Sequence, residues 1–171
     1  MANRRTLPFD PIAEARHNWA KANWGQTADG MALVTSVMRA HQILLARVDQ
    51  VLSPFELTFA RYEALMLLVF SSGGKLPLGK IGERLQVHPA SVTNVIDRLE
   101  QQALVRREQH PTDQRTTLAV ITPKGRRLAQ RASEALNKSV FSQPGVGNDR
   151  LQELFDGLAE LRHAAGDFDA C

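Results

Sequence analysis

The stretch Leu78–Leu99, LGKIGERLQVHPASVTNVIDRL, decides the fold of this chain. Apolar residues recur at helical spacing over 78–85 and make one continuous face. Three residues, 86–88, separate this segment from Pro89, which suits the first position of a second helix. Gly82 lies inside the first segment, where glycine costs about 1 kcal/mol relative to alanine, so we expect another helix to cross there at close range. The pattern predicts two short helices joined by a three-residue turn.

The second helix has two unlike faces. Its apolar stripe consists of Val92, Val95, Ile96 and Leu99. Its other side carries Ala90, Ser91, Thr93, Asn94, Asp97, Arg98 and Gln101. Small, hydrogen-bonding side chains at the N-terminal end are what a helix needs to enter the major groove and reach base edges, and a helix N-terminus also favours a phosphate. The alternative is an ordinary amphipathic surface helix.

A β-hairpin is predicted directly after the two helices. Residues 104–108 and 116–121 read as strands, and they are the only strands that we expect. The loop 109–115 between them is rich in turn residues. We expect Arg115 at its tip to enter a DNA minor groove and Asp113 to orient the tip by pairing with a nearby arginine. The alternative is a surface turn with a solvated Arg115.

The remainder of the chain reads as helical. Caps, prolines and apolar periodicity predict helices at 10–23, 29–52, 58–70, 123–140 and 149–165. The fold class is therefore mostly α with a small β-wing, with a winged helix-turn-helix DNA-binding lobe at 58–122. We assign 1–57 and 123–171 to a helical dimerisation region, because the apolar stripes of the helices at 10–23 and 149–165 lie outside the winged core. The alternative is that these helices pack on their own core.

Positive charge is concentrated in one part of the chain. Residues 75–131 contain eleven Lys or Arg against five Asp or Glu, although the net charge of the whole chain is only +3. Such a surplus is expected where a polyanion docks, and a solvated basic face is the alternative. No apolar run is as long as a membrane span and no secretory signal is evident, so we expect a cytoplasmic protein. The single cysteine, Cys171, excludes an internal disulfide, and its role is left open.

Catalytic and metal-site patterns are absent from the sequence. The histidines at positions 17, 41, 88, 110 and 163 have no metal-ligand spacing, and no phosphate-cradling glycine loop or nucleophile elbow is found. We therefore expect no enzymatic activity, no metal and no cofactor.

The region 78–128 resembles the MarR family of bacterial and archaeal regulators. The matching motifs are IGERL (81–85), SVTNVIDRLE (91–100), LVRR (104–107), Asp113-x-Arg115 and ITPKG (121–125). The resemblance implies a homodimer with interdigitated terminal helices, palindromic operators and relief of repression by small molecules. Gln114 departs from the pattern, since the family often has a second arginine there.

These observations predict a sequence-specific DNA-binding regulator, a repressor that binds double-stranded DNA as a homodimer. The expected DNA-contacting residues are Pro89, Ala90, Ser91, Thr93, Asn94, Arg98, His110, Asp113 and Arg115. The alternative function is a winged-helix module for protein–protein assembly, which would favour a neutral or acidic recognition surface.

The N-terminal segment 18–26, NWAKANWGQ, resembles the extra first helix of the urate-responsive branch of the MarR family. Trp19, Glu63 and Arg106 align with three ligand-site positions of that branch, with Glu63 in place of the usual aspartate. Val95 stands where the branch has an arginine in the recognition helix. The resemblance therefore implies the location of a pocket, and Val95 departs from the pattern that recognises urate.

The residues themselves suggest an effector of the same kind. A pocket between the dimer helices and the DNA-binding lobe would be lined by Trp19, His41 and Tyr62. Arg106 would pair with a carboxylate or phenolate, so an aromatic acid or a similar small anion is the expected ligand. The alternative is that both aromatic residues belong to the core and that Arg106 contacts phosphate or a glutamate.

Overall fold

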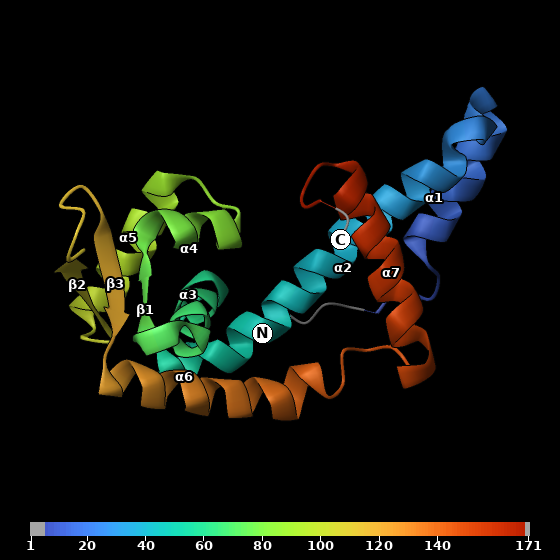
Figure 1. Ribbon diagram of the computed structural model, residues 1–171. Coiled ribbons are helices and arrows are strands. Elements are labelled where there is room, and N and C mark those ends of the chain that lie inside the picture. Colours follow the sequence, from blue (N-terminus) through green and yellow to red (C-terminus); the bar gives the residue numbers. More distant parts are fainter. Residues whose placement is uncertain (1–5, 170–171) are drawn as a thin grey trace.

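The computed structural model describes residues 6–169, so Cys171 lies outside the described part of the chain. The elements are α1 (Pro11–Trp19), α2 (Ala28–Leu52), α3 (Phe59–Phe70), β1 (Lys75–Pro77), α4 (Leu78–Leu85), α5 (Pro89–Gln101), β2 (Val105–Gln109), β3 (Thr117–Ile121), α6 (Pro123–Leu136) and α7 (Asn148–Ala164). A winged lobe holds α3, α4, α5 and the sheet, while α1 and α7 lie at the other side of the molecule (Figure 1). The long helices α2 and α6 connect the two sides. The predicted class, mostly helical with a small β-wing, is confirmed.

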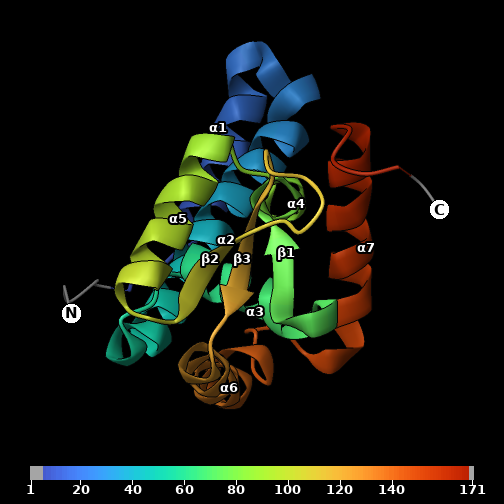
Figure 2. The same ribbon diagram turned by 60° about the vertical axis from the view of Figure 1, so that its left-hand side comes forward.

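The sheet has three antiparallel strands in the order β1-β3-β2 (Figure 2). Leu76 of β1 and Arg107 of β2 both pair with Ala119 of β3. The prediction of only two strands was wrong, because β1 adds a third. Its three residues are too few to show a periodic pattern, and the strand exists only because β3 offers a free edge.

The core of the winged lobe lies where α3, α5, α6 and the end of α2 meet. Its largest fully buried side chains are Leu52, Leu65, Leu68, Ile81, Ile96, Leu99, Leu104, Leu136 and Val105. The apolar stripes read from the sequence of α4 and α5 thus point into this core. Burying a leucine or isoleucine side chain contributes about 1.5–3 kcal/mol, so this cluster supplies most of the driving force for folding the lobe.

Two helix starts of the winged lobe are capped as the sequence predicts. The Thr58 hydroxyl accepts from the Arg61 amide at the start of α3, and the Thr122 hydroxyl accepts from the Gly125 amide at 3.0 Å. Gly125 is required there, because a Cβ atom would lie 2.1 Å from the carbonyl oxygen of Leu104. This close approach seats α6 against the entry of β2.

The first helix is shorter than predicted. Instead of reaching residue 23, α1 ends at Trp19 and a wider turn, Ala20–Trp24, follows it, with Asn23 at a φ of 64°. The Trp19 indole lies 4.9 Å from the Trp24 ring and donates through Nε1 to the Thr27 hydroxyl at 3.1 Å. These side-chain contacts fold α1 back onto the start of α2, which helical periodicity could not predict.

The connection from α6 to α7 is held by α2. The Arg47 guanidinium donates to the carbonyl oxygens of Gln143 at 2.6 Å, Pro144 at 3.1 Å and Ser139 at 3.3 Å. A cation there also opposes the negative end of the α6 dipole. The predicted linker over 143–147 is therefore anchored to α2.

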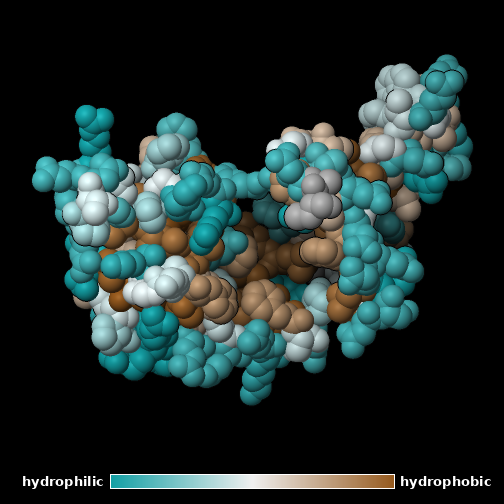
Figure 3. Space-filling view, in the orientation of Figure 1, coloured by the Kyte–Doolittle hydropathy of each residue, from teal (hydrophilic) through white to brown (hydrophobic). Residues whose placement is uncertain are grey.

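Apolar side chains on α2 and α7 remain uncovered. The exposed ones are Leu33, Val34, Met38, Ile43 and Leu44 on α2, and Leu154, Phe155, Leu158 and Leu161 on α7. No residue of α7 is buried. Figure 3 shows apolar residues gathered in the hollow between the winged lobe and α7. The idea that these terminal helices pack on their own core is wrong for α7, whose stripe faces no core of the described chain.

Candidate nucleic-acid interface

The helix-turn-helix forms as the sequence predicts. Helix α4 ends at Leu85, and Gln86 adopts a left-handed conformation with a φ of 52°. The Val87 amide then donates to the Gly82 carbonyl at 3.2 Å, which closes the turn before α5. A Cβ atom at Gly82 would lie 3.1 Å from Val92 Cγ2, so the expected close crossing of α4 and α5 is confirmed.

The N-terminal half of α5 presents a polar, open surface. All of the residues expected to contact DNA on this helix, Pro89, Ala90, Ser91, Thr93, Asn94 and Arg98, are exposed. The His88 imidazole caps the helix by accepting from the Ala90 amide at 3.2 Å. The Thr93 hydroxyl donates to the Pro89 carbonyl at 3.2 Å, which leaves its lone pairs free to accept from a base or a water.

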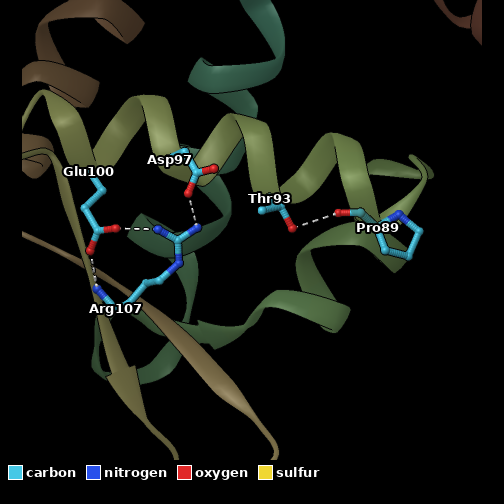
Figure 4. A network of polar contacts seen from close by, with 5 residues as sticks. All are labelled: Pro89, Thr93, Asp97, Glu100 and Arg107. Carbon is cyan, nitrogen blue, oxygen red and sulfur yellow. Dashed lines mark hydrogen bonds and ion pairs between the residues drawn. The ribbon is translucent and has the colours of Figure 1, made fainter.

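Arg107 of β2 joins the wing to α5 (Figure 4). Its Nη2 lies 2.6 Å from Asp97 Oδ1, its Nη1 contacts Glu100 Oε2, and its backbone amide donates to Glu100 Oε1 at 3.0 Å. We call these three residues the Arg107 clamp. Both carboxylates of α5 are thereby turned toward the strand, where the single guanidinium offsets one of their two negative charges. The wing and α5 are held as one unit.

The charges of the Arg107 clamp reinforce one another. Partial burial by itself would lower the pKa of the Arg107 guanidinium, but the hydrogen bonds and charges of Asp97 and Glu100 outweigh it and raise that pKa. Arg107 was missed as a functional residue. The available signal was two acidic residues three positions apart on α5, followed by an arginine pair in the first strand of the wing.

The wing tip is ordered by Asp113. Its Oδ1 accepts from the Arg115 amide at 3.0 Å and its Oδ2 accepts from the Thr116 hydroxyl at 2.6 Å. The Thr116 hydroxyl and then the Arg115 amide hold the pKa of the Asp113 carboxyl below its ordinary value. The expected pairing of Asp113 with an arginine was wrong, because the carboxylate is directed at donors of its own turn and forms no ion pair within residues 6–169.

This turn leaves the Arg115 side chain exposed at the tip, without a carboxylate partner among residues 6–169. His110 lies at the base of the tip, where its amide donates to the Thr116 carbonyl at 3.0 Å. Helix α5 and a free cation on the wing are therefore presented by one lobe.

The residues expected to bind a ligand are spread over three parts of the chain. Trp19 contacts Trp24 and Thr27 at the start of α2. Tyr62 is buried, and its hydroxyl is bonded to the Ser133 hydroxyl at 3.0 Å. His41 is exposed on α2. No contact within the described chain joins these three side chains to one another.

The two charged members of that set lie in different surroundings. Glu63 is half-buried on α3, and burial raises the pKa of its carboxyl. The Arg106 guanidinium is exposed and contacts Glu108 on its own strand, whereas the neighbouring Arg107 faces α5. Within one chain Arg106 therefore contacts a glutamate, as the alternative interpretation expected.

Membrane and metal features are not evident between residues 6 and 169. No helix there is both long and apolar enough to span a bilayer. No three His, Cys, Asp or Glu side chains of this range gather closely enough to hold a metal ion.

Two helices joined by a tight turn, followed by a hairpin with a basic tip, define a winged helix-turn-helix protein. The MarR family model matches residues 57–117. The crystal structure of Sco5413, a MarR family transcriptional regulator from Streptomyces coelicolor, shares 51% identity and a TM-score of 0.75 over 83% of this chain and 99% of that one. The chain therefore belongs to the MarR family.

Curated relatives agree with this assignment. The HTH-type transcriptional regulator YhbI of Bacillus subtilis is 34% identical over 50% of this chain. TtmR of Methylorubrum extorquens is 32% identical over 72% of this chain. The chain spans a little over half of the length of both relatives, 54% of YhbI and 58% of TtmR.

Proposed function

We propose that this chain is a sequence-specific transcriptional regulator, a repressor that binds palindromic DNA operators as a homodimer. The observation that carries the proposal is the exposed polar N-terminal half of α5 beside the free Arg115 on the same rigid lobe. The helix would read base edges in the major groove while Arg115 enters the adjacent minor groove. The Arg107 clamp supports this arrangement, because it withdraws both carboxylates of α5 from the DNA.

The uncovered stripes of α2 and α7 support a homodimer. Apolar surface of this extent on terminal helices is typical of an interface between subunits. We propose that 1–57 and 123–171 form the dimerisation region and that 58–122 is the DNA-binding lobe. A two-fold axis through the stripes would then present two recognition helices one turn of DNA apart, about 34 Å.

Proteins of similar fold have been crystallised with the two kinds of partner proposed here. Sco3205 from Streptomyces coelicolor was solved in complex with DNA, and CouR from Rhodococcus jostii was solved bound to p-coumaroyl-CoA. At 21% and 23% identity these likenesses concern the fold alone. They are compatible with DNA binding by the winged lobe and with a small-molecule effector.

We propose a small aromatic or organic anion as the effector that releases DNA. Its pocket would lie between the dimer helices and the winged lobe, lined by Trp19, His41, Tyr62, Glu63 and Arg106. The resemblance of the N-terminal segment to the urate-responsive branch supports this position. Since the residues do not meet within one chain, the pocket would require the partner subunit.

A contact in the structure suggests how such a ligand could act on DNA binding. The Gln86 amide side chain, in the turn between α4 and α5, donates to the Asp167 carbonyl at 2.7 Å, just beyond the end of α7. A shift of the dimer helices would therefore be transmitted to the helix-turn-helix. If the two recognition helices no longer match the half-site spacing, DNA affinity falls.

DNA binding is tested by fluorescence anisotropy with the promoter DNA adjacent to the gene. Affinity should fall steeply with salt, as counterion release predicts. Arg115→Ala should weaken binding to every duplex. Asn94→Ala and Ser91→Ala should instead change the preference between bases, each by about 1–3 kcal/mol of discrimination. Binding that is insensitive to salt and to all three changes would favour a protein-interaction module instead.

The oligomeric state is tested by sedimentation of the full chain. Phe155→Asp places a charge in the α7 stripe and should convert a dimer to a monomer. Glu160→Lys, at an exposed position of the same helix, is the matched control and should leave the dimer intact. A monomeric wild-type chain at micromolar concentration would exclude the proposed assembly.

The effector is sought with a thermal-shift screen of small organic anions, and each hit is then retested for release of the promoter DNA. A true effector should raise the melting temperature and lower DNA affinity together. Operator affinity that stays unchanged across a broad panel of aromatic acids would count against the proposed ligand class.

A further inference from the structure

An open notch of about 500 Å³ lies between the start of α3 and the outer face of α5. Its polar lining residues are Thr58, Arg61, Asn94, Arg98, Gln101 and Gln102. Asn94 and Arg98 belong both to this notch and to the surface expected to contact DNA. The notch is therefore continuous with the proposed DNA-binding face, although α3 lies outside the helix-turn-helix.

Arg61 is held in place by its own helix start. Its Nε donates to the Thr58 hydroxyl at 3.2 Å, and its Nη1 donates to the Glu56 carbonyl at 3.1 Å. Its Nη2 has no acceptor within the described residues. A guanidinium whose position is already fixed loses little conformational entropy when it binds an anion, so Arg61 is preorganised for this purpose.

Arg98 supplies a second cation to the notch. Its Nη1 donates to Gln101 Oε1 at 3.2 Å, one turn further along α5. Neither arginine forms an ion pair with a carboxylate in the part of the chain that the structure covers. The two carboxylates of α5 both contact Arg107 instead, and neither forms an ion pair with Arg61 or Arg98. The notch thus combines two free guanidinium groups with a lining that contains no acid.

We propose that this notch binds a phosphate of the DNA backbone beside the major groove that α5 reads, with Arg61 and Arg98 as its contacts. The forked donors of arginine match phosphate oxygens, and the N-terminus of α3 adds a partial positive charge on the same side. This inference rests on the proposed DNA-binding function and extends the interface to the helix before the helix-turn-helix. Arg61 would fix the register of the lobe on the duplex without reading sequence.

The test measures DNA affinity of the full chain by fluorescence anisotropy at several salt concentrations. Each phosphate contact contributes about 0.9 to the slope of log K against log[salt]. A homodimer loses two contacts with each substitution, so Arg61→Gln and Arg98→Gln should each lower the magnitude of the slope by about 1.8. The loss of affinity relative to wild type should then shrink about 12-fold between 50 and 200 mM salt. Removing Arg61 should weaken all duplexes equally.

Two further variants separate the phosphate contact from other effects. Arg127→Gln, at an exposed position of α6 outside the notch, removes the same charge and should leave the slope unchanged. Arg61→Lys keeps the charge and loses the fork, so it should keep the slope and recover only part of the affinity. Thermal unfolding of each variant shows whether the fold is intact.

The outcomes are distinguishable. Wild-type protein without salt-dependent DNA binding would overturn the proposed function itself. Wild-type binding with an unchanged slope in Arg61→Gln would overturn the phosphate notch alone, even if affinity fell, because the role of Arg61 would then be structural. A small anion could raise the melting temperature of the wild type but not that of Arg61→Gln, while both proteins bind DNA equally well. The notch would then be an effector site, and the proposal would be refuted.

Discussion

Replacing Arg107 by methionine should weaken both the fold and DNA binding. The substitution keeps most of the side-chain volume but leaves Asp97 and Glu100 without their cation. The Arg107 side chain is 26% exposed, whereas those of Asp97 and Glu100 are 47% and 40% exposed. The clamp therefore lies between a surface ion pair, worth about 0–1 kcal/mol, and a buried pair, which costs about 3–5 kcal/mol to break.

Solvent screening of the two half-exposed carboxylates brings the expected loss to about 1–2 kcal/mol for the whole clamp. For a chain of this length that corresponds to a fall of roughly 2–8 °C in the melting temperature. The matched control is Arg106→Met on the same strand. Its exposed pair with Glu108 should contribute at most about 0.5 kcal/mol.

DNA affinity should fall further than stability explains, because two unpaired negative charges would lie on the recognition helix. Urea unfolding measures the first effect, and anisotropy at a concentration where the protein is fully folded measures the second. Adding Asp97→Asn and Glu100→Gln to Arg107→Met should recover DNA affinity, since the repulsive charges are removed. If this triple variant binds no better than Arg107→Met, charge neutralisation by the clamp is not its contribution to DNA binding.

Three other predictions follow from single residues. Gly125→Ala brings a Cβ atom to 2.1 Å from the Leu104 carbonyl and should cost about 1–3 kcal/mol in urea unfolding; wild-type stability would contradict the close seating of α6. Burial raises the pKa of the Glu63 carboxyl, so ionisation of Glu63 destabilises the fold as pH rises through the raised pKa. Glu63→Gln should therefore raise the melting temperature at neutral pH. Well below the ordinary carboxyl pKa it should leave the melting temperature unchanged. Asp113→Ala should speed hydrogen exchange of the Thr116 amide, which donates to the Asp113 carbonyl in the ordered turn. In the wild type the pKa of the Asp113 carboxyl is lowered. Its charge therefore orders the tip fully above the ordinary carboxyl pKa, and this ordering is lost as pH falls through the lowered pKa. Exchange of the Thr116 amide that is equally slow in Asp113→Ala would show that the Asp113 side chain does not order the tip.

Local patterns were enough to predict the helices and the hairpin of the winged lobe, because their signals lie within each element. The spacing of apolar residues in α4 and α5, Pro89 at a helix start, and Thr122 before Pro123 all act within a few residues of one another. The close crossing at Gly82 was also predictable, since a glycine inside a short helix is unfavourable unless a neighbour requires it.

Contacts between distant residues could not be predicted in this way. The strand β1 depends on the edge of β3, and the end of α1 depends on Trp19 reaching Thr27. The grouping of candidate site residues also depends on such contacts. Arg106 and Arg107 are adjacent in sequence, but the alternation of side chains along β2 turns only Arg107 toward α5.

The sequence by itself determined the fold class, the helix-turn-helix and the exposed face of α5, because these follow from local periodicity and capping. Only the tertiary structure decided which charges remain free. Arg107 forms ion pairs with the two carboxylates of α5, and Asp113 accepts hydrogen bonds from its own turn. The cations left without acidic partners among the described residues are Arg61, Arg98 and Arg115. Electrostatic pairing depends on distance in space, and folding brings together residues whose distance the order of the chain does not specify.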